Sequence, residues 1–343
     1  KDEKYGFIDV NGNVVIDFKY DKVYDFSEGL ACVEKDGNFG YINKKGETII
    51  DFQYSDPSIR FSNVIYGKNI SSFINGIACV KKDGKFGYID NTGKLLIDFT
   101  FDYGWPFYNE LALTSNGYID RNGNVVIDIT KYDVANSFSN NLAKIGKRDE
   151  SRSFEFYDYG YIDLSNQIVI PFKFEEAENF SEGLARVGIH KGYFNSMFGR
   201  LPYNLYGFID KTGKFVIEPK FPDPMLNSLY ESEKDEFHEG LAVMGKRVGN
   251  NMLAKKFGYI DKVGNWIIPP IYDGAGGFIH NRAIVMENEK YGCINNKGEV
   301  IIDIEYDDYQ GRRQNDSIII FKKNDIEYKF RLDGTIINDL TKK

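Results

Sequence analysis

The side chains best suited to catalysis or metal binding are few in this chain. The three histidines, His190, His238 and His280, stand in different segments, and "FHEGLA" contains only the first two letters of a His-Glu-x-x-His zinc motif. The sequence has no nucleophile elbow, Gly-rich phosphate loop or Cys-x-x-Cys pair. We therefore expect no catalytic residue, metal site or cofactor, and we expect that the protein is not an enzyme.

Two stretches, "DVNGN" at Asp9 and "DRNGN" at Asp120, resemble the start of a calcium loop because oxygen atoms recur at every second residue. In a helix-loop-helix calcium site, however, the glycine follows the third ligand. Here Gly12 and Gly123 come one residue early, and neither stretch has a helical pattern. We interpret both as hairpin turns in which the aspartate side chain accepts hydrogen bonds from the turn backbone.

The three cysteines are interpreted as small apolar residues. Cys32 and Cys79 occupy the same place in "GLACV" and "GIACV", and Cys293 replaces an aromatic residue in "YGCI". Other copies of the Cys32 position carry Leu113, Lys144, Arg186 and Val243. This mixture predicts that the position faces outward or lies at a sheet edge.

A word of an aromatic residue, Gly, an aromatic residue, Ile and Asp or Asn recurs along the chain. Its glycines stand at positions 6, 40, 87, 117, 160, 207, 258 and 292. Such a spacing is typical of solenoids, propellers and other repeat arrays. Each word leads through a turn such as "NTGK" or "KTGK" into an apolar run, which predicts a β-hairpin because glycine supplies the positive φ of a tight turn.

A second word precedes the first in each repeat, as in "FSEGLACV" at Phe26 and "FSEGLARV" at Phe180. Its alternating residues predict a strand with one buried face. Each unit is thus a predicted three-stranded meander. A lone sheet of three short strands is only marginally stable in water, so its aromatic face must pack on the neighbouring units.

The combination of these words resembles the bacterial WG-repeat family over essentially the whole chain, although Tyr-Gly or Phe-Gly stands where that family has Trp-Gly. The resemblance implies repeats used mainly as scaffolds or interaction surfaces, with no catalytic residue to carry over. The predicted fold class is all-β, with tandem three-stranded β-meander repeats.

We expect a single repeat domain over residues 1–343. It would comprise about eight repeats plus an N-terminal half-repeat hairpin, with 303–343 as a degenerate C-terminal capping repeat. The sequence contains nine hairpins but eight "GLA" strands, and this unequal number favours an open superhelical array. A closed β-propeller-like ring is the alternative.

The net charge of -8 argues against nucleic acid or anionic lipid as a partner of the whole protein. No run of 18 or more apolar residues occurs, so we expect no transmembrane segment in this chain. The first residue is Lys rather than Met, from which we expect that a targeting segment or another domain has been removed upstream.

Three consecutive repeats lengthen the turn between the "GLA" strand and the aromatic-Gly strand, at residues 146–158, 188–205 and 245–256. Interruptions of the same turn in adjacent repeats should emerge side by side along one edge. They hold nine basic and four acidic residues, with exposed aromatics that are typical of interface centres. The candidate partner-binding residues are Lys147, Arg148, Arg152, Lys191, Tyr193, Phe194, Phe198, Arg200, Tyr203, Lys246, Arg247, Lys255 and Lys256.

Three interpretations of these loops stay open: they cover their own repeats, they bind a protein partner, or they form a groove for single-stranded nucleic acid. We expect a non-enzymatic repeat scaffold that mediates protein-protein interaction through them. The alternative is a cell-surface or secreted glycan-binding module, because aromatic residues can stack on sugars. Most aromatics, however, recur at fixed repeat positions, which is typical of a core between repeats.

Overall fold

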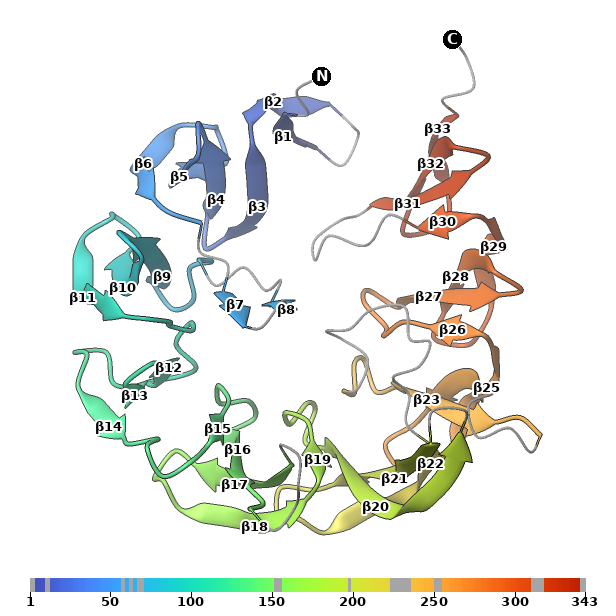
Figure 1. Cartoon of the computed structure of the whole chain (residues 1–343). Helices are drawn as coiled ribbons and strands as arrows, with labels where there is room; N and C mark the ends of the chain where they lie inside the picture. Colours follow the sequence, from blue (N-terminus) through green and yellow to red (C-terminus); the bar gives the residue numbers. More distant parts are fainter. Residues whose placement is uncertain are drawn as a thin grey trace. The chain divides into compact units, whose positions relative to one another are not determined.

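The computed structural model describes residues 4–9, 13–56, 59–61, 64–66, 71–150, 156–196, 199–222, 236–249, 255–309 and 318–339. Residues 59–61, 64–66, 194–196, 199–202, 318, 338 and 339 are described by their backbone alone. The chain divides into two compact units, residues 1–132 and 133–343. Figure 1 labels their strands. The expectation of one domain over 1–343 stays a prediction.

The described residues form strands and turns and contain no helix, so the all-β prediction is confirmed. It follows that none of them forms a helix able to cross a membrane. The strands of the first unit are β1 (Tyr5–Ile8), β2 (Val14–Tyr20), β3 (Lys22–Ser27), β4 (Leu30–Lys35), β5 (Asn38–Asn43), β6 (Thr48–Tyr54), β7 (Ile59–Phe61), β8 (Val64–Tyr66), β9 (Ile77–Lys82), β10 (Lys85–Asp90), β11 (Leu95–Phe101), β12 (Ala112–Thr114), β13 (Gly117–Ile119) and β14 (Val125–Ile127).

The second unit continues the same pattern. Its strands are β15 (Val134–Ala135), β16 (Leu142–Arg148), β17 (Tyr157–Asp163), β18 (Ile168–Phe174), β19 (Glu176–Ala177), β20 (Ala185–Ser196), β21 (Gly199–Ile209), β22 (Phe215–Pro222), β23 (Ala242–Arg247), β24 (Lys255–Ile260), β25 (Trp266–Tyr272), β26 (Gly274–Ala275), β27 (Arg282–Glu287), β28 (Lys290–Asn295), β29 (Val300–Tyr306), β30 (Asp308–Tyr309), β31 (Ile318–Lys323), β32 (Ile326–Arg331) and β33 (Ile336–Asp339).

Each repeat is a small antiparallel sheet whose strands follow one another in chain order. Three sheets are the predicted three-stranded meander, and five gain an additional first strand that pairs with the "GLA" strand (β3, β15, β19, β26 and β30). In Figure 1, the two-residue strand β15 lies at one edge of its sheet and β18 at the other. The tandem meander prediction is confirmed.

No sheet among the described residues combines strands from the two ends of the chain. The first sheet consists of β1 and β2 alone, and the last consists of β30 to β33. Within this part of the chain, therefore, no ring is closed through a sheet that both ends share.

The glycine of the aromatic-Gly word stands opposite a β-bulge in the outer strand. Phe39 pairs with Tyr54 and Tyr41 with Ile50, so three residues of β6 lie opposite Gly40. A Cβ atom on Gly40 would lie 2.7 Å from the Ile50 carbonyl oxygen. Only glycine permits this approach, and Ile50 and Tyr54, the residues that flank the bulge, are both buried.

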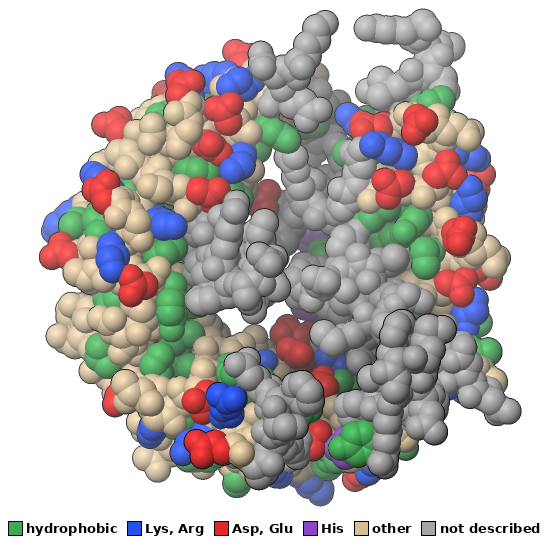
Figure 2. All heavy atoms as spheres, in the orientation of Figure 1, with side chains coloured by type: hydrophobic (Ala, Val, Ile, Leu, Met, Phe, Trp, Pro, Cys, Tyr) green, Lys and Arg blue, Asp and Glu red, His purple; other side chains and the backbone are tan. Residues whose placement is uncertain are grey.

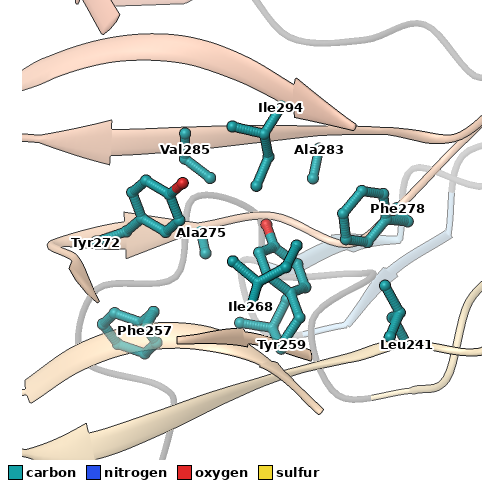
Figure 3. Close-up of a cluster of buried hydrophobic side chains, with 11 residues drawn as sticks. Leu241, Phe257, Tyr259, Ile268, Tyr272, Ala275, Phe278, Ala283, Val285 and Ile294 are labelled. Carbon is teal, nitrogen blue, oxygen red and sulfur yellow. The ribbon is translucent and has the colours of Figure 1, made fainter. Parts of the chain in front are cut away.

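Within each unit, successive sheets stack, and the hydrophobic clusters lie between two repeats. In the cluster of Figure 3, Phe257, Tyr259 and Ile268 of one sheet pack against Val285 and Ile294 of the next. The predicted packing of aromatic faces on neighbouring repeats is confirmed. The hairpin turns join the same contact, because a Cβ on Gly93 would lie 3.2 Å from a methyl group of Ile50 in the preceding repeat.

The position of Cys32 is buried, and the prediction that it faces outward is wrong. Cys32 is 2% exposed and packs toward the following repeat, while Ala31 and Val33 pack toward the preceding hairpin. Both faces of a "GLA" strand are covered because a repeat stacks on each side. The equivalent residues Leu113, Arg186 and Val243 are 2 to 3% exposed, and Lys144 is partly buried.

In several repeats the "FSEG" word forms hydrogen bonds to the following repeat. The Ser27 hydroxyl donates to the Phe73 carbonyl at 2.6 Å, and the Glu28 carboxylate accepts from the Asn75 and Gly76 amides at 2.6 and 2.8 Å. The second unit has the same contact at three places. The Gly183 amide donates to the Asn140 side chain, the Gly240 amide to Glu182, and the Asn281 amide to Glu239. We call this contact the inter-repeat clamp.

The aspartates that end the aromatic-Gly strands hold the hairpin turns, as predicted. The Asp90 carboxylate accepts hydrogen bonds from the backbone amides of Thr92 and Lys94 at 2.9 and 3.0 Å. Asp120 makes the same contacts with the amides of Asn122 and Asn124. The hairpin interpretation of "DRNGN" is therefore confirmed, while residues 10–12 of "DVNGN" lie outside the described part of the chain.

Candidate interaction surface

The three lengthened turns join equivalent strands of three consecutive sheets in the second unit. They connect β16 to β17, β20 to β21 and β23 to β24. The middle turn forms the longest hairpin of the described chain, pairing from Ala185 with Ile209 out to Ser196 with Gly199. The outer strand β22 pairs with β21 only as far as Leu205. Residues 190–196 and 199–204 therefore continue as a two-stranded ribbon, which we call the ribbon.

The base of the ribbon is anchored by two carboxylates of the preceding connection. The Glu176 carboxylate accepts hydrogen bonds from the Asn204 amide at 2.7 Å and the Tyr206 hydroxyl at 2.5 Å. The Glu175 carboxylate lies 3.9 Å from Nδ1 of His190. These contacts fix the direction in which the ribbon leaves its sheet.

The ribbon has two faces with different side chains. On one face a bulge at Gly192 leaves room for the Tyr203 ring, and the Arg247 guanidinium lies 5.1 Å from the centre of that ring. This cation-π contact joins the second lengthened turn to the third. The ring of Tyr193, which is 52% exposed, contacts the His190 ring. The two ring centres are 4.9 Å apart.

The first lengthened turn contributes two exposed basic residues. Lys147 pairs across the hairpin with Asp158, and Arg148 pairs with Tyr157. The Arg148 backbone amide also donates to the Asp133 carboxylate at 2.8 Å, a contact that the Asp36 amide makes with Asp21 in the first repeat. The backbone of Arg148 thus belongs to the repeat scaffold, while its side chain is exposed.

The third turn places its four basic residues differently. Lys246 is exposed and Arg247 is half-buried under its contact with Tyr203, whereas Lys255 is buried. Lys256 forms an ion pair with Asp273 at 2.7 Å, which lowers the pKa of the Asp273 carboxyl. Lys4 and Lys85 form the same pair in other repeats, so Lys256 holds a position of the repeat scaffold.

Four predicted residues are not placed in full. Arg152 and Phe198 lie outside the described residues, and Phe194 and Arg200 are described by their backbone alone. The exposed or half-exposed part of the candidate surface around the ribbon consists of Lys191, Tyr193, Tyr203, Lys246 and Arg247. We call these five residues the ribbon surface. Whether they bind a partner stays a prediction.

A charged cluster beside the ribbon base was missed at the sequence level. Arg186 is 2% exposed, and one of its terminal nitrogens lies 3.5 Å from the Glu178 carboxylate while its guanidinium lies 4.4 Å from the Tyr206 ring centre. The Lys144 ammonium donates to the Ala177 carbonyl at 2.6 Å and lies 3.8 Å from the Glu178 carboxylate. In the sequence, the only sign of this cluster is that two adjacent repeats carry a cation, Lys144 or Arg186, at the Cys32 position. On sequence alone, a cation at that position predicts exposure.

Figure 2 shows Lys and Arg side chains interspersed with Asp and Glu over the described part of the face in view. In the ribbon surface the charged members, Lys191, Lys246 and Arg247, are all basic, and Arg247 lies over the Tyr203 ring. Such a combination can bind acidic and apolar groups of a partner together.

The repeats themselves identify the family. The sequence profile of the "WG containing repeat" family matches residues 5–39, 39–63, 66–86, 86–116, 117–149, 159–193, 206–223, 257–291 and 291–325. The chain belongs to the WG containing repeat family. Except for 66–86, the matched segments begin at or beside the aromatic-Gly word, so most of them start with one hairpin and continue toward the next sheet. A comparison with curated protein sequences finds no match.

Solved structures add a likeness of fold. A chain described as "Crystal structure of the eukaryotic initiation factor" superimposes with a TM-score of 0.51 at 10% identity, covering 91% of this chain and 85% of that one. The V. cholerae biofilm matrix protein Bap1 has a TM-score of 0.25 at 9% identity, covering 87% and 72% of the two chains. The first likeness concerns the fold alone, and the second is too weak to carry an argument.

Proposed function

We propose that this WG-repeat protein is a non-enzymatic scaffold that binds a protein partner through the ribbon surface. The observation that carries the proposal is the ribbon itself, which extends beyond the outer strand of its sheet and is anchored at its base by Glu176. Its edges beyond Leu205 are not paired by other described strands. Exposed strand edges with flanking aromatic and basic side chains are recurrent protein-binding features.

The glycan alternative is less well supported. Most of the aromatics that suggested sugar stacking are repeat residues such as Tyr41, Tyr88 and Tyr161, which are at most 1% exposed. Among the described residues of the ribbon surface, Tyr193 alone is a highly exposed ring. A sugar-binding role would have to depend on that ring.

The test removes the ribbon and keeps the sheet. Ile189 and Leu205 pair in the long hairpin as Lys35 and Asn38 do in the first repeat, where Asp36 and Gly37 form the turn. Replacing residues 190–204 by Asp-Gly should therefore leave the sheet intact, which circular dichroism and the melting temperature would check. We expect the partner recovered by the intact protein in quantitative pull-downs to be lost.

Point variants localise the effect. Tyr193→Ala should reduce recovery of the partner, whereas Val263→Ala, at a 66% exposed turn position of another sheet, should not. A folded ribbon-deletion variant that retains the partner would refute the proposal. Binding on a glycan array that is lost with Tyr193→Ala would support the alternative instead.

A further inference from the structure

The outer strands of three successive sheets in the first unit carry an exposed aliphatic residue at the same position. Ile49 in β6, Leu96 in β11 and Val126 in β14 are 44%, 40% and 52% exposed. Each of them directly precedes a buried isoleucine. In Figure 1 these three strands follow one another along one side of the unit. The exposed aliphatic residues therefore form a regular series on its surface.

The three strands adjoin one another through the hairpin turns. A Cβ on Gly93, in the turn before β11, would lie 3.2 Å from a methyl group of Ile50. A Cβ on Gly123, in the turn before β14, would lie 3.0 Å from a methyl group of Ile97. Because stacked sheets are spaced by about 10 Å, the exposed aliphatic residues recur at roughly that interval.

An exposed aspartate stands two residues after each of these aliphatic residues, at Asp51, Asp98 and Asp128. The Asp128 carboxylate accepts a hydrogen bond from the Thr130 amide at 2.8 Å. No described residue forms a hydrogen bond or an ion pair with the carboxylates of Asp51 and Asp98. Three cations of these repeats pair with other acceptors: Lys82 with Gln53, Lys85 with Asp102, and Arg121 with Glu110.

The repeat does not require an acid at this position. Pro171 in β18 and Pro269 in β25 take its place, and their sheets keep the same bulged pairing. The aspartates are the only charged residues within 48–54, 95–101 and 125–130. The three outer strands of the first unit therefore combine exposed aliphatic groups with negative charge that their fold does not demand.

We propose that these three aliphatic residues and three aspartates, which we call the outer stripe, bind a basic amphipathic helix of a partner protein. An α-helix rises about 10.5 Å in one heptad, which matches the roughly 10 Å between successive sheets. One leucine in each heptad contacts an aliphatic residue of the stripe. A Lys or Arg four residues later, on the same face of the helix, lies beside the aspartate.

The charge and the fold of this protein favour a partner protein as the occupant. The aspartates repel an anionic membrane surface. A second copy of this chain has no helix to offer within its described residues. The outer stripe lies in the first unit, so it is separate from the ribbon surface and does not depend on the function proposed for that surface.

The test uses the full chain and a fluorescent synthetic peptide of three identical heptads, "LAEAKAQ". In this helix Lys lies beside Leu, whereas Glu lies on the opposite face. The matched control peptide, "LAKAEAQ", has the same composition with Lys and Glu exchanged. By fluorescence anisotropy we expect saturable binding of the first peptide. The control should bind about tenfold more weakly or less, because its Glu faces the aspartates.

Protein variants place the peptide on the outer stripe. Leu96→Asp and Asp98→Lys should each weaken binding about tenfold. The matched controls are Val169→Asp and Glu218→Lys, at exposed equivalent positions of β18 and β22 in the second unit, and both should bind the peptide as the parent does. Circular dichroism checks that the variants are folded, and the two peptides test the parent protein without any substitution.

Four results would overturn the proposal. They are the absence of saturable binding, equal binding of the two peptides, an equal loss of binding in the control variants, and self-association of the parent protein that Asp98→Lys abolishes in sedimentation experiments. The last result would identify a second copy as the occupant.

Discussion

At the scale of single residues, the glycines of this protein have two distinct roles. Gly37 lies in a turn with φ of +80° and has open space where a Cβ would stand. Gly40 faces a bulge, and its Cβ would lie 2.7 Å from the Ile50 carbonyl oxygen. The first role is conformational and the second is steric, and a sequence shows both as the same letter.

This difference predicts unequal effects of alanine. Gly37→Ala should lower the free energy of unfolding by about 1 kcal/mol, the cost of a left-handed backbone for a residue with a side chain. Gly40→Ala should cost more, about 2 to 4 kcal/mol, because β5 and β6 must separate. Urea unfolding of the two variants beside the parent protein measures both values. Equal destabilisation would contradict the steric role of Gly40.

At the scale of elements, the "FSEG" turn connects one sheet to the next as well as reversing the chain. The Glu182 carboxylate accepts from the Gly240 amide at 3.1 Å and forms an ion pair with Lys262 at 2.9 Å, both in the following repeat. Burial opposes the charge of Glu182, but the bonds from Lys262 and Gly240 prevail and lower the pKa of its carboxyl. The same turn thus contributes to local structure and to stacking.

Removing this carboxylate should weaken the contact between two sheets. Glu182→Ala is expected to lower the free energy of unfolding by about 1 kcal/mol, since the bonds are charge-assisted but partly exposed. Glu218→Ala, on the exposed face of the outer strand β22, is the matched control and should stay within about 0.5 kcal/mol of the parent. Urea unfolding of both variants and the parent protein, monitored by circular dichroism, measures these differences in the free energy of unfolding. A Glu182 variant as stable as the control would argue against the clamp.

At the scale of the whole molecule, repetition multiplies small electrostatic effects. Hydrogen bonds and ion pairs lower the pKa of nine aspartates (Asp21, Asp90, Asp120, Asp128, Asp210, Asp261, Asp273, Asp307 and Asp333) and of Glu182. Their folded-state pKa values therefore lie below those of the unfolded chain. The resulting stabilisation is complete above the unfolded pKa, about 4, and is lost as the pH falls through the folded values.

We therefore expect acid to destabilise the protein through many sites at once. The urea midpoint should change little between pH 7 and 5 on account of these carboxyls and should fall progressively below pH 4. Asp90→Asn and Asp210→Asn should each reduce this dependence, because Asn43 already accepts the same turn bonds from Lys45 and Glu47 without charge. A midpoint that is constant down to pH 3 would contradict this account.

The three buried cysteines can report on the opening of each unit. Burial raises the pKa of the Cys79 thiol to about 12 and that of Cys32 further, and both lie in the first unit, while the buried Cys293 lies in the second. In variants with a single cysteine, a thiol reagent should react with the native protein only as fast as the surrounding repeat opens. Different rates for Cys79 and Cys293 would measure separate opening of the two units. Immediate reaction at pH 7 would contradict their burial.

The sequence alone determined the repeat, because its words recur at each structural position. It predicted the hairpins from turn glycines and the meander from strand order, and it identified which turns are lengthened. It failed at the Cys32 position, where Lys144 and Arg186 suggested exposure. The alternation of residues in one strand predicts which face of a single sheet is buried. Here both faces are buried, because a repeat stacks on each side of the strand.

Only the tertiary structure decided what depends on contacts between repeats. It showed that Gly40 faces a bulge, that Glu28 bonds to the next turn, and that Tyr203 and Arg247 from two lengthened turns meet while Lys255 is buried. The reason is physical: a repeated sequence specifies one unit many times, but stacking determines which surfaces of each unit are covered.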